Sequence, residues 1–525
     1  MAKITTHTIN GPLDKTACST VNTASVDDDS NGNGNNNGTI DARKEREFLW
    51  RLDLGFLTIG FLGYVFKYLD QINISNAYVS GMQDDLKLYG NELNYFTTYF
   101  NIGYMVMLFP SCILISYIGP SIWLPACEVL WGVFTCCLST VTNEKQVYGL
   151  RFLIGFFEGV TWPGYYTIIR SVCLKPALSQ GEKLLNRRLS QWYLPEELAL
   201  RMSLYNIAQP VGAMMSGAIQ GSLATNLDES LGRAGWRWAF IINGICTIFV
   251  ALIAFVLLPG YPERPNPLSK IYLKDRHIEI ALARGRRVGR KPQTGITIKS
   301  FLRTFKIWFF WAIVLSWPIG SNTVPTNYFN LWLRSLKNAD GTAKYSVGML
   351  NYLPIAGQAI QLVAEVIFSA LSDRFGRFPF LLIHSVINTT SLVILIIQPA
   401  NEQAHMAGYY LNYMGAVSLM LLCSWASTHL QDEPEVRTIL FASGTIISYA
   451  LNAFVPIAVF PASEAPHWRI GAKLYLGFAV VAMFMFIGTH IGFRREDQAK
   501  RKAGAAQNGY RSSEVRAGTL PTPAD

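Results

Sequence analysis

Twelve runs of about 20 mostly apolar residues follow one another along this sequence, and they constrain its fold more than any other feature. A helix of that length crosses the hydrocarbon core of a lipid bilayer. The runs lie near residues 50–70, 94–115, 122–141, 147–170, 201–223, 237–258, 307–329, 347–370, 379–398, 407–427, 438–460 and 472–493. Composition agrees, because only 15% of the 525 residues are charged, against roughly 25% in soluble domains. The sequence therefore predicts an all-α integral membrane protein with twelve transmembrane helices.

A basic segment divides these runs into two groups of six. Residues 260–306 contain twelve Lys and Arg residues but only three acidic ones. Loops with such an excess of positive charge stay on the cytoplasmic side of a membrane. Basic clusters before the first run and after the last run place both predicted tails on that side. The charge favours a loop beside lipid over a nucleic-acid site, because no aromatic or motif pattern accompanies it.

The sequence predicts five consecutive regions. Residues 1–45 are rich in Ser, Thr, Asn, Gly and Asp, which cannot bury a core, so we expect a disordered cytoplasmic tail. The other regions are an N-terminal six-helix half at 46–259, a basic cytoplasmic loop at 260–306, a C-terminal six-helix half at 307–493 and a second disordered tail at 494–525. We expect a monomer without cofactor, metal or enzyme activity, because the sequence has no phosphate-binding loop, metal-ligand cluster or nucleophile elbow.

The fourth run carries two charges, Arg151 and Glu158. Seven residues make two helical turns, about 10 Å, so both side chains lie on one face of a helix. A charge at the bilayer centre costs at least about 3 kcal/mol, so this face should meet a protein interior or a water-filled cavity. There Arg151 suits an organic carboxylate and Glu158 suits a proton. The alternative is a structural ion pair, in which Glu158 only neutralises Arg151.

Two more acidic residues lie within predicted membrane helices. Asp70, near the outer end of the first run, is a candidate site for a proton or a cationic group, and the alternative is that it caps the next helix. Glu365 lies within the eighth run, where it either takes part in proton coupling or has a packing role in which it is paired with a partner. The sequence alone leaves both alternatives open.

The seventh run is the best candidate for a broken helix that lines a cavity. Pro318 and Pro325 interrupt it, and backbone groups freed at membrane depth must be satisfied by protein or by cavity water. The polar residues beside these breaks that we expect to contact the substrate are Asn322, Asn327 and Tyr328. Isolated prolines in the fifth and eleventh runs, Pro210 and Pro456, are predicted only to bend packed helices.

The segment between the eighth and ninth runs, SALSDRFGRFPF (369–380), is a short charged turn. Its glycine permits a tight bend and its charges can pair across helix ends; the residues are Asp373, Arg374, Gly376 and Arg377. The segment resembles the interhelical signature of the major facilitator superfamily, Gly-x-x-x-Asp-Arg-x-Gly-Arg, with Ser369 in place of the first glycine. The resemblance implies a transporter with two six-helix halves and a gating role for this turn. The equivalent turn of the first half, residues 116–121, lacks the charges.

A second resemblance is more specific. It rests on the segments KYLDQINISNAYVSGM (67–82), RFLIGFFEGVTWPGYY (151–166), GWRWAFIING (235–244) and YSVGMLNYLP (345–354), among others. These are similar to the fungal anion:cation symporter family of allantoate and vitamin permeases, and NELNYFTTYFNIGY (91–104) looks most like the pantothenate and biotin branch.

This family resemblance implies proton-coupled uptake of a small organic carboxylate, such as pantothenate, biotin or an allantoate-like anion, across the plasma membrane. The substrate is expected near the membrane midplane, between the first, fourth, fifth, seventh, eighth and eleventh runs. Fold alone does not set the direction of transport. Export of a fungal metabolite and a nutrient receptor that does not transport therefore stay as alternatives.

Residues 172–190, VCLKPALSQGEKLLNRRLS, interrupt this second resemblance. The family usually passes from its fourth helix to the Trp-Tyr pair, here Trp192 and Tyr193, with almost no gap. One interpretation is a polar, basic cytoplasmic loop. The other is a retained intron, since every valine codon begins with GT, as introns do. Sequencing the transcript decides between them.

Overall fold

The computed structural model of the chain describes residues 42–161, 192–193, 195–262, 264–287, 298–323, 325–430 and 434–517. The predicted insert at 172–190 lies outside these residues. By length and composition, eight of the helical stretches described could each cross a membrane. The predicted runs coincide with helices in both halves, and the later part of the fourth run is outside the described residues.

The N-terminal half is built from helices that run back and forth in an antiparallel bundle. They are α1 (Ala42–Leu52), α2 (Thr58–Ala77), α3 (Gln83–Asp85), α4 (Glu92–Ile118), α5 (Pro120–Cys137), α6 (Glu144–Glu158), α8 (Pro195–Asn226) and α9 (Gly235–Leu257), with π-helical turns η1 (Asp53–Leu57) and η2 (Tyr78–Met82) on either side of α2. Polar caps fix some of the starts. At α6, for example, the Asn143 side chain accepts a hydrogen bond from the backbone N–H of Gln146.

A connecting segment leads to the C-terminal half. It contains a two-stranded antiparallel sheet, β1 (Gly260–Tyr261) and β2 (Arg264–Pro265), followed by α10 (Asp275–Arg287) and α11 (Ile298–Thr304). The C-terminal helices are α12 (Trp308–Ser321), α13 (Phe329–Ser335), α14 (Val347–Phe375), α15 (Arg377–Ile397), α16 (Glu402–Asn412), α17 (Val417–His429), α18 (Pro434–Val459) and α19 (Gly471–Ala517).

Helices extend into both of the segments that were predicted to be disordered tails. Helix α1 starts at Ala42, because Phe48 and Leu52 on its apolar face are completely buried and Glu45 pairs with Arg284 of α10. Helix α19 continues past residue 494 to Ala517, through a segment rich in Ala, Arg, Lys and Gln, which are good helix formers. The prediction of disorder at 42–45 and at 494–517 is therefore wrong.

The seventh run is broken, as predicted. Helix α12 ends at Ser321, a 3₁₀ turn η6 follows at Pro325–Tyr328, and α13 then begins at Phe329. By contrast, α8 and α18 continue through Pro210 and Pro456. The prediction that these isolated prolines do not break their helices is confirmed.

A glycine turn joins the second and third membrane helices in each half. Gly376 joins α14 to α15 with φ 92° and ψ 153°, and Gly119 joins α4 to α5 with φ 97° and ψ 145°. This backbone region is essentially restricted to glycine. The first half has thus kept the geometry of the signature turn while losing its charges.

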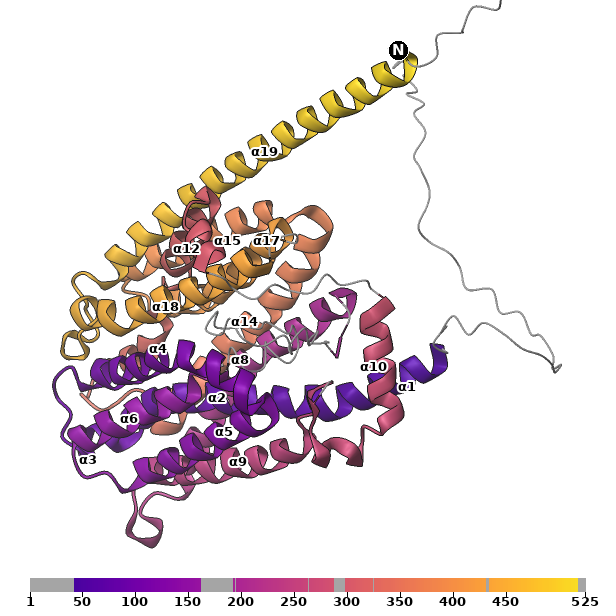
Figure 1. Cartoon of the computed structure of the whole chain (residues 1–525). Helices are drawn as coiled ribbons and strands as arrows, with labels where there is room; N and C mark the ends of the chain where they lie inside the picture. Colours follow the sequence, from indigo (N-terminus) through magenta and orange to yellow (C-terminus); the bar gives the residue numbers. More distant parts are fainter. Residues whose placement is uncertain are drawn as a thin grey trace, which may run out of the picture.

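The halves lie side by side (Figure 1). We call the end that carries α1 and α10 the basic end, and the end that carries η2 and α3 the far end. Among the described residues, the hydrogen bonds that join the two halves lie at the far end. These bonds join Asn94 to Pro456, Phe460 and Tyr328, Asn76 to Asn330, Thr98 to Ala453, Asn91 to Ile457 and Ala462, Ser80 to Asn351, Ser222 to Tyr352, and Arg334 to Tyr78, Gln83 and Asp84.

Candidate functional site

A cavity of about 410 Å³ lies between the halves, toward the middle of the helices. Its walls come from α2, α4, α6 and α8 on one side and from α12, α14 and α18 on the other. These include all six of the runs that were expected around the substrate. Helix α4 and the segment around Ala416 and Leu419 also contribute, which the sequence did not indicate.

Arg151 lies in the wall of this cavity, as expected for a residue that meets an anion. Its side chain is only 2% exposed, its Nε donates to the backbone carbonyl of Phe96 at 3.5 Å, and its guanidinium lies 4.5 Å from the centre of the Phe100 ring. Packing holds α6 in position, because Gly155 lies directly against the backbone of Phe100 on α4. The guanidinium therefore reaches the cavity from a rigid helix pair.

Glu158 is completely buried one layer behind the cavity. Its Oε1 accepts a hydrogen bond from Nε2 of Gln71 at 2.5 Å, and Gln71 itself lines the cavity. Its Oε2 accepts no hydrogen bond from the part of the chain that the structure describes. Within that same part, Glu158 and Arg151 are not within the 4.0 Å of an ion pair, so the two side chains do not contact each other directly in this structure.

Glu365 has a similar environment in the other half. It is 5% exposed on α14, and its Oε1 accepts a hydrogen bond from Nε2 of Gln361 at 2.9 Å. Gln361 lines the cavity just as Gln71 does. Gln361, the hydrogen-bond partner of Glu365, is on the same helix, and both the coupling role and the packing role stay open. Each half thus places one carboxyl group behind one cavity glutamine.

Asp70 points away from the cavity. It lies inside α2, which continues to Ala77, so the alternative of a helix cap is wrong. The Asp70 Oδ1 accepts a hydrogen bond from Nδ2 of Asn243 on α9 at 3.1 Å. It is buried in the N-terminal half and is not among the residues that line the cavity.

The broken seventh run supplies uncharged polar groups to the opposite wall. Asn322, Asn327 and Tyr328 all line the cavity. Asn322 exchanges two 3.4 Å hydrogen bonds with Ser448 on α18. The Tyr328 hydroxyl donates to Asn94 Oδ1 at 2.8 Å across the two halves, so Tyr328 also belongs to the far-end contact.

The signature turn lies at the basic end, away from the cavity. Arg377 contacts Asp373 at 3.4 Å and donates to Thr428 Oγ1 of α17 at 2.5 Å, so both contacts stay within the C-terminal half. Arg374 lies beside the ring of Phe375. Gly376 provides the turn itself. These residues are brought together as predicted, but apart from the candidate substrate residues.

Lys67 is a charged residue of the cavity that was not among the predicted site residues. It is 1% exposed on α2, lines the cavity, and lies four residues before Gln71 on the same helix face. Its Nζ lies 5.0 Å, 4.6 Å and 5.3 Å from the ring centres of Tyr64, Tyr68 and Tyr104. The feature of the sequence that could have indicated it is a lysine inside the first apolar run.

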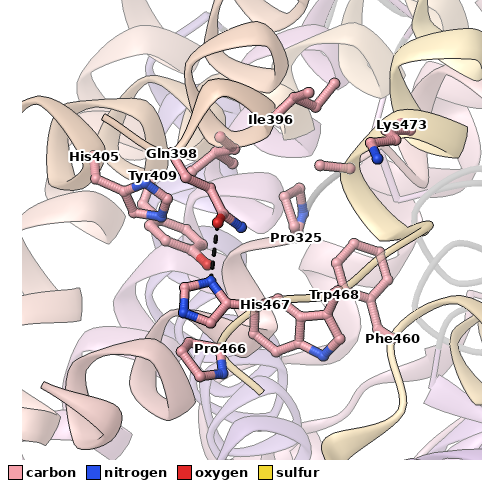
Figure 2. A pocket seen from close by; sticks show the side chains of 12 residues that line it. Pro325, Ile396, Gln398, His405, Tyr409, Phe460, Pro466, His467, Trp468 and Lys473 are labelled. Carbon is pink, nitrogen blue, oxygen red and sulfur yellow. Dashed lines mark hydrogen bonds between the residues drawn. The ribbon is translucent and has the colours of Figure 1, made fainter. Parts of the chain in front are cut away.

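A smaller pocket of about 170 Å³ lies in the C-terminal half at the far end (Figure 2). In it, the rings of His405 and Tyr409 meet edge to face, and His467 Nδ1 is 2.9 Å from Gln398 Oε1. It shares none of the charged residues of the central cavity. The central cavity is therefore the better candidate for a site between two moving halves.

Comparison with known proteins agrees with this fold. A sequence profile described as Major Facilitator Superfamily matches residues 60–180 and 184–456. The pantothenate transporter FEN2 of Saccharomyces cerevisiae is 28% identical over 84% of this chain and 82% of its own length. The MFS transporter PfmaC of Pestalotiopsis fici is 30% identical over 88% and 83%, and the vitamin H transporter of S. cerevisiae is 27% identical over 86% and 73%.

Solved structures show the same fold. The xylose transporter XylE of E. coli, in a partially occluded inward open conformation, matches with a TM-score of 0.60 and 15% identity, over 83% of this chain and 97% of that one. A bacterial homologue of the lysosomal transporter Spinster, in an inward-facing and occupied conformation, matches with a TM-score of 0.56 and 15% identity, over 83% and 96%.

Proposed function

Because the chain belongs to the major facilitator superfamily, and is thus a multi-pass membrane transporter rather than an enzyme, we propose that it carries a small organic carboxylate of the vitamin class into the cell together with a proton. Fungal relatives named as pantothenate and vitamin H transporters support this substrate class. The candidate cargoes are pantothenate, biotin and allantoate-like anions, and the candidate location is the plasma membrane.

The charge of the central cavity carries the proposal. Among the described residues that line it, the charged side chains are Lys67 and Arg151, and both are cations. A cation taken out of water is unfavourable unless an anion or oriented dipoles compensate it. A substrate carboxylate supplies that compensation, whereas a cationic substrate would be repelled.

The carboxyl groups behind the glutamines support coupling to protons. If Glu158 takes up a proton as an anionic substrate enters, the net charge of the buried site does not change. Gln71 keeps Glu158 within one hydrogen bond of the cavity, so a proton can reach it from cavity water. Glu365, behind Gln361, is the corresponding group in the other half.

The contacts between the halves support alternating access. If the basic end is cytoplasmic, as its charge indicates, the far-end contacts close the outer side and this structure is the inward-facing state. We assign the turn of Asp373, Arg374, Gly376 and Arg377 to the opposite step, in which the basic ends of the helices approach one another. The structural contact that supports this role is the one between Arg377 and Thr428, which fixes the turn against α17.

Uptake in yeast strains that lack their own pantothenate or biotin transporter tests the proposal. We expect growth on limiting vitamin, accumulation of the labelled vitamin above its external concentration, and loss of accumulation with a protonophore. A Lys67→Gln, Arg151→Gln double variant of equal surface abundance is the control and should not rescue growth. Binding of vitamin by purified protein without any uptake would instead indicate a receptor, and lowered intracellular vitamin would indicate an exporter.

A further inference from the structure

We propose that the Lys67 ammonium is the group that binds the carboxylate of the substrate, so that the substrate lies with its acidic end on the N-terminal half and its uncharged polar end on the C-terminal half. This inference rests on the proposed function, in which the cargo is an organic carboxylate. It adds a specificity residue and an orientation that the fold and the relatives do not provide.

The position of Lys67 fits this role. It is in the middle of α2, where 1% of it is exposed, and it lines the cavity beside Tyr68 and Tyr104. The neighbouring cavity residue on the same face, one turn further along, is Gln71. An occupant that touches Lys67 therefore lies next to the glutamine that holds Glu158.

The bonding of Lys67 is incomplete. Among the residues that the structure describes, its ammonium has no hydrogen bond and no acidic group within 4.0 Å, and its contacts are the faces of three tyrosine rings. Ring faces attract a cation but accept none of its three N–H bonds in the way an oxygen does. Those donors are available for the two oxygens of a carboxylate.

Arg151 is the weaker candidate for the same contact. Its Nε already donates to the Phe96 carbonyl, and its guanidinium is stacked on Phe100. The acidic group that acts electrostatically on Lys67 is Glu158, which is held by Gln71 instead of by Lys67. A substrate carboxylate can therefore approach Lys67 without displacing a bonded partner, whereas at Arg151 one N–H is already used and one face of the guanidinium lies against the Phe100 ring.

The other wall determines the orientation. The described C-terminal residues that line the cavity are uncharged, and several of them carry amides: Asn322, Asn327, Gln358, Gln361 and Asn452. Amides both donate and accept hydrogen bonds, so they suit hydroxyl, amide or ureido groups. One ring beside Lys67, Tyr104, stacks on Tyr449 of the C-terminal half with ring centres 4.1 Å apart. The carboxylate end of the substrate thus lies against the junction between the halves.

Paired ligands that differ only in charge test the inference with the purified full-length protein. Pantothenate is compared with panthenol, and biotin with its primary amide, by titration calorimetry. We expect the wild type to bind the carboxylate of at least one pair more than tenfold tighter than its neutral analogue. In Lys67→Gln this ratio should fall below threefold while affinity for the neutral analogue changes little. Lys67→Arg should keep most of the ratio, and Arg151→Gln should keep it within threefold of the wild type.

A ratio that persists in Lys67→Gln, or that disappears in Arg151→Gln alone, overturns the inference and leaves the proposed function intact. A wild type that prefers no carboxylate in either pair overturns the proposed function and the inference with it.

Protection of wild-type Lys67 from an amine-acylating reagent, followed by mass spectrometry, does not depend on any variant folding. The preferred carboxylate should protect Lys67 and its neutral analogue should not, while Lys473 in the smaller pocket is the unprotected control. Equal labelling of Lys67 with and without the carboxylate contradicts the inference.

Discussion

Glu158 is the residue on which energy coupling depends in this proposal. Replacing it with glutamine keeps its size and its contact with Gln71 but removes the group that binds a proton. We expect proton-driven accumulation by Glu158→Gln to fall at least tenfold, while exchange of internal for external substrate continues. Labelled-vitamin uptake and exchange in proteoliposomes measure the two activities.

The control for this substitution is Glu464→Gln, which alters a carboxylate at the far end that pairs with Arg469. It should leave accumulation unchanged. Normal accumulation by Glu158→Gln would remove this residue from the coupling step and leave Glu365 as the candidate.

Arg151 is expected to set the electrostatic potential of the cavity from its position behind Phe100. Loss of one buried charge should weaken the binding of an anion, but less than loss of Lys67, so we expect the KM of Arg151→Ala for uptake to rise about two- to threefold, which corresponds to at most about 0.7 kcal/mol. Uptake kinetics at equal surface abundance measure this change. A KM equal to that of the wild type would show that Lys67 acts alone.

The close packing of α6 against α4 positions the side chains of Arg151 and Glu158. A Cβ atom at Gly155 would be 2.1 Å from the carbonyl oxygen of Phe100, and one at Gly103 would be 2.2 Å from that of Phe152. Small residues of this kind let membrane helices approach closely. We expect Gly155→Val to force the helices apart and cost about 1–3 kcal/mol of stability, in the range of overpacked cores.

Thermal unfolding of the purified variants measures this cost. The matched control is Gly149→Val, on the same helix but with nothing within 4 Å of its added Cβ. It should unfold close to the wild-type temperature. If Gly155→Val were as stable as Gly149→Val, the close approach of α4 and α6 would not be what fixes Arg151 and Glu158.

At the scale of the whole molecule, we expect the far-end contacts to set the balance between the two access states of the proposed transport cycle. The hydrogen bond from Tyr328 to Asn94 joins the halves only while that end is closed. Its loss in Tyr328→Phe should shift the equilibrium toward the outward-open state by about 1 kcal/mol, the usual net value of a hydrogen bond.

Labelling by a membrane-impermeant thiol reagent from outside the cell measures this shift, with a cysteine placed at Asn452 in a cysteine-free background. We expect severalfold faster labelling in Tyr328→Phe. The control is Tyr345→Phe, whose hydroxyl contacts Glu402 within one half, and which should label at the parental rate. Equal rates in all three proteins would argue against a far-end gate.

Patterns that repeat along one helix were predicted from the sequence, and relations between helices were not. The apolar runs, the break in the seventh run and the glycine turn at Gly376 are all local, because length, proline and backbone conformation decide them. Asp70 faces α9 and not the cavity because of how α2 is rotated about its axis, which a sequence does not specify. The role of Lys67 depends on Tyr104, a residue of another helix.

The composition of the far-end contact determines how it responds to changes in pH and salt concentration. The residues that join the halves there are mainly Asn, Thr, Ser and Tyr, and the ion pair that crosses between the described parts of the two halves, Arg334 with Asp84, is partly open to water. Amides and hydroxyls do not titrate in weak acid, and their hydrogen bonds are little screened by salt. These far-end contacts should therefore keep their strength in acidic or salty medium. Under the proposed proton coupling, an acidic medium can then drive uptake without opening this end of the protein.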